Sequence, residues 1–251
     1  MFDRYRRARP FILGIPPLIL ASLVLFNQTR PQDTGWVASL VALSAMLAVM
    51  LGAGGLKLED VGLDRDMLAR GVGITLMTWA ATQVIGVLPR VAAEDPVAIH
   101  RSWLHGSALS IGGNLVTALS AATLAEVALR GFLLVQLYLL FHHDPKDSTQ
   151  GVLGAVLVTV VVGNAVALIG SWPVSSTHAL LLTQAIAAAT GLYLSWIYLR
   201  TRNLFFAIGV HTLVLAPTPV VAGLRGEPEW FFPVVVAAVA AVWVLLWPRR
   251  D

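Results

Sequence analysis

The chain has 251 residues, of which 57% are hydrophobic and only 12% charged, and its mean hydropathy is +0.76. A globular domain is roughly 45–50% apolar and about 25% charged, so this chain has more apolar surface than one soluble core can bury, and lipid is its expected solvent. The absence of cysteine excludes disulfides, thiolate metal sites and cysteine nucleophiles, and the arginines at the ends of apolar runs indicate membrane topology rather than a nucleic-acid surface.

The apolar runs predict an all-α, polytopic transmembrane helix bundle that forms a single multi-pass membrane domain over residues 1–251. A bilayer core about 30 Å thick needs about 20 apolar residues in a helix. Helix is the expected state because lipid cannot satisfy the polar groups of an open sheet edge. About eight spans are predicted, at 10–26, 35–55, 67–88, 106–141, 151–170, 179–199, 204–222 and 231–247.

The fourth run, 106–141, is longer than a bilayer requires. Its 36 residues would extend about 54 Å as a straight helix. We therefore expect it to tilt, to kink or to project into the cytoplasm, with Gly131 as the weak point. The neighbouring pair Gly112 and Gly113 predicts a close approach of another helix.

The basic residues predict that the N-terminus, the C-terminus and the 142–150 loop are all cytoplasmic. With eight passes, the cytoplasmic side receives twelve basic residues, namely Arg4, Arg6, Arg7, Arg9, Lys57, Arg65, Arg70, Lys146, Arg200, Arg202, Arg249 and Arg250. The outer side receives four, namely Arg30, Arg90, Arg101 and Arg225. If the fourth run crossed twice, every later residue would change sides and this bias would be lost.

Charged and polar side chains inside the spans are candidate functional residues, because inserting a charge costs about 2.5–3.5 kcal/mol even on a lenient scale. Glu126 and Arg130 in AEVALRG lie four residues apart, share a helix face and can pair. The pair is either a structural ion pair or part of a polar catalytic cavity. His211, Asn164 and Gln184 are either polar links between helices or members of such a cavity.

Three stretches resemble the motif regions of the CAAX-protease and bacteriocin-processing (CPBP/Abi) family of intramembrane peptidases. They are AEVALRGFLL at 125–134, VVVGNAVALIG at 160–170 and GLYLSWIYLRTRNLFFAIGVH at 191–211. The run YLRTRNLFFAIGVH is typical of bacterial members, and GLKLEDVGLDRD at 55–66 resembles an amphipathic segment that they have. The resemblance covers roughly residues 50 to 215 and implies a core at 106–215 that contains the three motif regions.

The first motif of that family is Glu-Glu-x-x-x-Arg. By resemblance, Glu126 and Arg130 correspond to its second glutamate and its arginine, and Ala125 replaces the first glutamate. The first glutamate is the expected base that activates water, and alanine has no proton acceptor. Glu126 is a poor replacement, because it points about 100° around the helix from Ala125 and pairing with Arg130 would weaken it as a base.

The second and third motifs, Phe-x-x-x-His and His-x-x-x-Asn/Asp, are also altered. Asn164 stands where the resemblance implies the second-motif histidine, and it can orient a water but cannot take its proton. His211 is the third-motif histidine, but Leu215 follows it where an amide or acid is expected. One lost oxyanion donor can lower the rate by ~10²–10³.

These replacements favour a membrane protein on the peptidase fold with a disabled active site and a binding or scaffolding role. The alternative is an active intramembrane endopeptidase, a hydrolase that processes prenylated proteins or leader peptides at a divergent site formed by Glu126, Arg130, His211 and Asn164. A transporter is a third class, but the sequence shows no inverted repeat or paired broken helices.

The expected surroundings follow from the same residues. We expect no cofactor, and the sequence leaves a divalent metal open. The expected partners are the lipid bilayer and a membrane-embedded or prenylated peptide or another membrane protein, with no nucleic acid. The expected location is the plasma membrane of a prokaryote, as a multi-pass integral protein.

Overall fold

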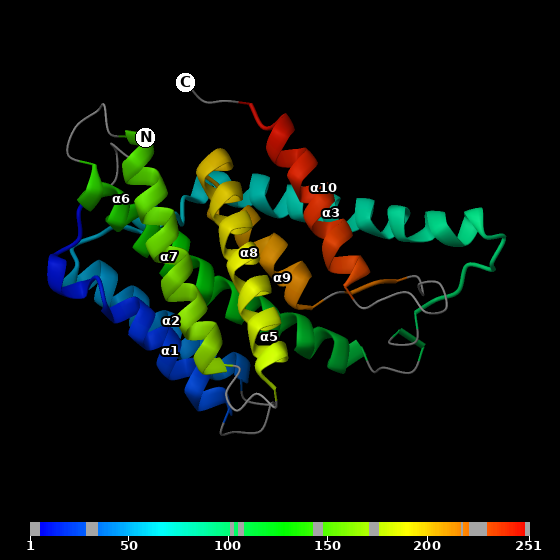
Figure 1. Ribbon diagram of the computed structural model, residues 1–251, viewed down its shortest axis with the longest axis horizontal. Helices are drawn as coiled ribbons and strands as arrows, with labels where there is room; N and C mark the ends of the chain where they lie inside the picture. The colour runs from blue at the N-terminus through cyan, green and yellow to red at the C-terminus, as the bar shows by residue number, and fades with distance from the viewer. Residues whose placement is uncertain are drawn as a thin grey trace.

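The computed structural model describes residues 6–28, 35–100, 103–104, 108–142, 148–170, 176–216, 218–220 and 230–248. The prediction of an all-α helical bundle is confirmed (Figure 1). The elements are η1 (Pro10–Ile12), α1 (Ile15–Gln28), α2 (Gly35–Ala48), η3 (Val49–Ala53), η4 (Leu58–Val61), α3 (Arg65–Ala92), α5 (Ala108–Glu126), η5 (Val127–Leu134), α6 (Val135–Phe141), α7 (Ser148–Gly170), α8 (Thr177–Thr201), α9 (Leu204–Leu215) and α10 (Phe231–Leu246).

Each of the eight predicted spans coincides with an apolar helix. Five stretches are long and apolar enough to cross a membrane by length and composition, namely Trp36–Ala53, Leu58–Ala92, Ile111–Phe141, Thr149–Gly170 and Thr177–Thr201. The other three, at Pro10–Leu25, Leu204–Leu215 and Phe231–Leu246, are shorter.

The predicted end of the seventh span, at residue 222, is wrong. Helix α9 ends at Leu215. The next residues are Ala216, Pro217, Thr218 and Pro219. Proline has no backbone N–H and moves the residue before it out of helical geometry, so two prolines in three positions stop the helix.

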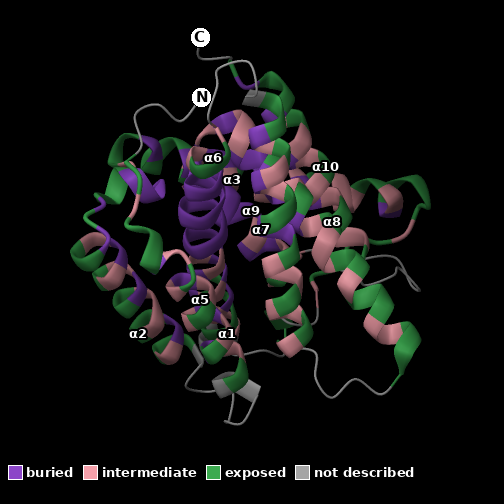
Figure 2. Cartoon of the chain, turned by 60° about the vertical axis from the view of Figure 1, so that its left-hand side comes forward, coloured by how far each residue is buried: buried purple, intermediate pink, exposed green. Residues whose placement is uncertain are grey.

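The long fourth run forms the centre of the bundle. Helices α5, η5 and α6 follow one another without a break from Ala108 to Phe141. Of its apolar window 78% is buried, against 22% or less for the other four long stretches, and Figure 2 shows the buried residues gathered in the middle of the bundle. The central helix is therefore packed among other helices of the protein over most of its length.

Gly131 lies inside a π-helical stretch, since η5 has π geometry from Val127 to Leu134. A Cβ at Gly131 would meet the backbone carbonyl of Val61 in η4, so the missing side chain lets η4 lie directly on this helix. The prediction of a close helix approach at Gly112 and Gly113 is wrong, because no described atom lies within 4 Å of a Cβ built at either position.

Several segments meet at one end of the bundle. The backbone N–H of Arg6 donates to Asp60 Oδ1 in η4 over 3.2 Å, and Gly62 lies against Tyr198 and Leu204. The guanidinium of Arg200 at the end of α8 donates to the carbonyl of Trp247, just after α10, over 3.4 Å. The predicted topology requires these segments to share one side of the membrane.

Which side of the membrane this end faces stays a prediction. Residues 1–5, 143–147 and 249–251, on which part of the topology prediction rests, lie outside the described residues.

Candidate functional site

The polar site lies where the central helix meets α9. Glu126 is the last residue of α5, and Arg130 follows one turn later in η5. His211 is placed by the start of α9, where Asn203 caps the helix by accepting from the N–H of Phe206 over 3.1 Å. The amide of Asn203 also donates to the carbonyl of Met67 in α3 over 3.0 Å, which fixes α9 against α3.

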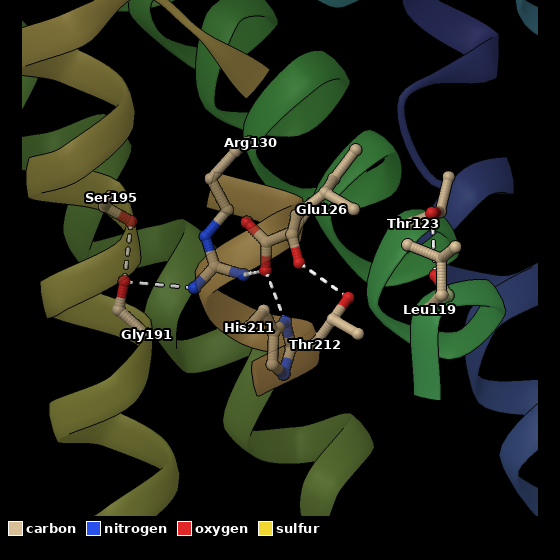
Figure 3. A network of polar contacts seen from close by, with 9 residues as sticks. Leu119, Thr123, Glu126, Arg130, Gly191, Ser195, His211 and Thr212 are labelled. Atoms are coloured by element: carbon tan, nitrogen blue, oxygen red, sulfur yellow. Dashed lines mark hydrogen bonds and ion pairs between the residues drawn. The ribbon is translucent and has the colours of Figure 1, made fainter. Parts of the chain in front are cut away.

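One carboxylate oxygen of Glu126 binds two partners (Figure 3). Nη1 of Arg130 lies 3.0 Å from Glu126 Oε1, and Nδ1 of His211 lies 2.7 Å from the same oxygen. The Glu126 side chain is fully buried, and those of Arg130 and His211 are 4% and 16% exposed. An ionised carboxylate only accepts hydrogen bonds, so Nδ1 of His211 donates and Nε2 remains an acceptor when the ring is neutral.

Helix α8 also contributes to the site, through the backbone carbonyl of Gly191. Nη2 of Arg130 donates to the carbonyl of Gly191 over 3.0 Å, and the hydroxyl of Ser195 donates to the same carbonyl over 2.7 Å. A Cβ at Gly191 would lie 3.5 Å from Nη2 of Arg130 and 3.4 Å from Val160. Sequence reasoning missed this contact, because the partner is a backbone carbonyl, which every residue type has.

Two polar atoms of the site have no partner among the described residues. They are Oε2 of Glu126 and Nε of Arg130, both buried. The charges of Glu126 and Arg130 balance each other, but the second carboxylate oxygen and one donor of the guanidinium remain unsatisfied. Such atoms are common where a water or a ligand group completes a buried polar cluster.

The other motif positions lie apart from this cluster. Within the described residues, no hydrogen bond joins Asn164 on α7 to Glu126, Arg130 or His211, and its buried Oδ1 has no partner there. With the Gln184 amide oriented to satisfy both of its ends, its nitrogen donates to the backbone carbonyl of Asn164 over 3.1 Å, which links α8 to α7. Ala125 packs against the apolar core.

A cavity of about 530 Å³ lies one turn from the cluster, on the groove between α5 and α9. Ala121 on its wall precedes Ala125 by one turn, and Leu215 follows His211 by one turn. Leu215 is half exposed and lines the cavity. None of the described residues that line it is charged; they are Trp103, Ile111, Asn114, Thr117, Ala118, Ala121, Leu215, Ala216 and Thr218.

Helix α3 holds the chain that follows α9, where Thr218 lines the cavity. The indole of Trp79 donates to the hydroxyl of Thr218 over 3.0 Å. The side-chain oxygen of Gln83 accepts from the N–H of Val220 over 2.7 Å. Although α9 has ended, the chain after it is therefore fixed beside the cavity.

Among the described residues, no three histidine, cysteine, aspartate or glutamate side chains come close enough to hold a metal ion. Glu126 and His211 would offer two ligands, and Arg130 occupies the same carboxylate oxygen.

The comparisons with known proteins agree with the resemblance. Residues 107–216 match the family model described as Rce1-like, type II CAAX prenyl endopeptidase Rce1-like. No curated protein matches the chain, and no solved structure does.

Proposed function

Because residues 107–216 match the family model described as Rce1-like, type II CAAX prenyl endopeptidase Rce1-like, we propose that the chain is an integral membrane protein on the CAAX-type intramembrane peptidase fold. We propose further that its catalytic site is disabled and that its role is binding or scaffolding. The proposed core is 106–215 within a single multi-pass domain. We place the protein in the plasma membrane of a prokaryote, because YLRTRNLFFAIGVH resembles the bacterial members.

One observation supports this proposal above the others. The Glu126 carboxylate is fully buried, and its Oε1 is already bound by both Arg130 and His211. A general base must be free to reach the proton that it removes. Glu126 instead has the geometry of a structural counter-charge that lets Arg130 link the central helix to α8.

The replaced motif positions support the same proposal. Ala125 has no proton acceptor, Asn164 cannot take up a proton, and Leu215 removes an oxyanion donor beside the cavity. Catalytic groups of this kind act as a unit, so the loss of several is not made up by those that remain.

The cavity suggests what is bound. Its walls are apolar apart from Asn114, Thr117 and Thr218, which are neutral and can both donate and accept hydrogen bonds. A volume of about 530 Å³ is within the range of small-ligand pockets. The proposed partners are therefore a membrane-embedded or prenylated peptide, or a segment of another membrane protein, surrounded by the lipid bilayer.

The second candidate function is an active intramembrane endopeptidase. The observation that favours it is the buried, unpartnered Oε2 of Glu126, which lies on the same carboxylate as the His211 contact. A water held by this oxygen would have a carboxylate and an imidazole beside it. In that case Glu126 serves as the base that Ala125 cannot provide.

The test is hydrolysis of a fluorogenic prenylated peptide by the purified protein. We expect no cleavage by the wild type, because no free base faces the substrate. If the site is intact in shape, the triple variant Ala125→Glu, Asn164→His, Leu215→Asn gains weak hydrolysis, while each single variant gains almost none.

Two results would overturn this proposal or part of it. Wild-type turnover that is lost in Glu126→Gln or His211→Ala would establish the endopeptidase instead. A triple variant that folds, as judged by its thermal melt, and yet cleaves nothing would remove the claim that the catalytic geometry is preserved.

A further inference from the structure

The first described residues of the chain are held by a buried glutamine. Oε1 of Gln136 in α6 accepts from the N–H of Ala8 over 2.7 Å, and its Nε2 donates to the carbonyl of Arg6 over 3.0 Å. One side chain therefore binds the backbone of residues 6–8 at two points. Gln136 is only 4% exposed, so these two bonds satisfy a polar side chain inside the bundle.

A second contact fixes the same segment against η4. Oδ1 of Asp60 accepts from the N–H of Arg6 over 3.2 Å, and Oδ2 accepts from the N–H of Lys57 over 2.8 Å. Asp60 is 6% exposed. Figure 1 shows the blue start of the chain beside α6. The segment Arg6–Pro10 is thus tied through its backbone, and its side chains are not needed to hold it.

The side chains of this segment point their charges outward. Arg6, Arg7 and Arg9 are exposed. Within the described part of the chain, no ion pair joins any of the three to a carboxylate. Three cations within four residues, on a backbone held by Gln136 and Asp60, form a preorganised anion-binding surface.

The apolar neighbours indicate where this surface lies. Phe11 is 65% exposed and directly follows the segment, and Leu58 in η4 is 47% exposed beside Lys57. Arginines beside exposed apolar side chains suit the membrane–water interface, where the apolar groups reach the hydrocarbon and the guanidinium groups reach the lipid headgroups. The anions in reach of the segment are then those of the lipids.

We propose that Arg6, Arg7 and Arg9, held in place by Gln136 and Asp60, form a binding surface for the headgroups of anionic phospholipids. Arginine suits this role, because its planar guanidinium can donate two hydrogen bonds to one phosphate. Each basic residue near an anionic membrane surface contributes an affinity change of about five-fold. Because the segment is attached to α6 and η4, headgroup binding stabilises the bundle itself.

The experiment measures thermal melts of the detergent-solubilised, full-length protein while short-chain phosphatidylglycerol is added. Parallel titrations use short-chain phosphatidylcholine and inorganic phosphate. We expect phosphatidylglycerol to raise the melting temperature and the other two to have little effect. For the double variant Arg7→Gln, Arg9→Gln, we expect that about twenty-five-fold more phosphatidylglycerol is needed for half of the shift.

The matched control is Lys57→Gln, Arg65→Gln, which removes the same charge from two exposed residues at the same end of the bundle. We expect it to keep most of the wild-type response. A third variant, Gln136→Leu, retains every arginine but releases the segment, and it should weaken the phosphatidylglycerol response.

Three outcomes would overturn the proposal. The first is an equal loss in the two double variants, since net charge alone would then explain binding. The second is an equal shift with inorganic phosphate, which would assign the surface to a free anion. The third is a wild type that does not distinguish phosphatidylglycerol from phosphatidylcholine.

Discussion

At the scale of single residues, the two oxygens of the Glu126 carboxylate have different surroundings. Oε1 lies within hydrogen-bond distance of both Arg130 and His211, while Oε2 is buried without a partner in the described structure. Arg130 also donates to the Gly191 carbonyl on α8. Arg130 therefore links the central helix to α8, and Glu126 links it to α9.

We predict that Arg130→Ala destabilises the protein more than Glu126→Gln does. Removing Arg130 leaves a buried carboxylate without its counter-charge and a carbonyl without its donor, and breaking a buried pair in this way costs about 3–5 kcal/mol. Glu126→Gln keeps the shape and a hydrogen-bond acceptor near Arg130, so the loss should be smaller. Thermal melts in detergent measure both.

Melting temperatures that fall equally in the two variants, or further in Glu126→Gln, would contradict an anchoring role for Arg130. The variant Arg130→Lys is the matched control. It retains the charge but has no second guanidinium nitrogen for the Gly191 carbonyl, so its melt should lie between those of the wild type and Arg130→Ala.

Sequence reasoning could predict the candidate residues of this cluster but not all of their contacts. A four-residue spacing places Glu126 and Arg130 on one helix face, so their pairing follows from helix geometry. The contact between Glu126 and His211 joins residues 85 positions apart and depends on how α9 packs on the central helix. Nothing in the sequence marks the Gly191 carbonyl, because it belongs to the backbone.

At the scale of elements, the junction between η4 and η5 depends on one missing side chain. A Cβ at Gly131 would meet the Val61 carbonyl, with Leu204 Cδ2 at 3.0 Å. The short helix η4 therefore rests on the backbone of the central helix rather than on its side chains. Backbone atoms cannot turn aside as the end of a long side chain can.

We therefore predict that Gly131→Ala destabilises the protein by about 1–3 kcal/mol, as expected for an overpacked interior. The matched control is Gly113→Ala on α5, where no described atom lies within 4 Å of the new Cβ. That change should stay within about 0.5 kcal/mol, as is usual for exposed positions. Thermal melts of the two variants should differ clearly, and similar melts would contradict the close contact between η4 and η5.

Sequence reasoning singled out Gly131 and the pair Gly112 and Gly113, but it assigned the close approach to the pair. Gly112 and Gly113 form the more obvious pair of small residues, yet Gly131 is the position where another element makes contact. Small residues are necessary for close packing in membranes but do not select the partner. Which glycine is contacted depends on where η4 packs on the central helix, and the local sequence pattern does not specify that position.

At the scale of the whole molecule, the helical bundle and its eight apolar segments follow from composition and run length alone. What the sequence could not show is which helix is central. Helix α7 is more apolar than the central helix and yet much less buried. In lipid, the outside of a bundle is as apolar as its inside, so hydropathy does not separate the two.

The twelve-to-four distribution of basic residues predicts that both ends of the chain and the 142–150 loop are cytoplasmic. The chain has no cysteine, so one introduced cysteine is a unique label. We expect Ser148→Cys and Asp251→Cys to be protected from a membrane-impermeant thiol reagent added to intact cells and to react after the membrane is opened.

Ser102→Cys, in the segment predicted to lie outside, is the control and should react in intact cells. If Ser148→Cys reacts there as well, the single crossing of the central helix is wrong, and every later helix changes direction.

The π geometry of η5 sets how Glu126 and Gln136 are oriented relative to each other around the central helix. A π-helical turn accommodates an additional residue compared with an α-helical turn, and in η5 it lies between Glu126 and Gln136. If the same residues took α geometry instead, everything after η5 would turn by about 100°. Gln136 would then face away from Arg6 and Ala8. The wide turn thus sets the phase in which one continuous helix holds the buried ion pair at one point and the start of the chain at another.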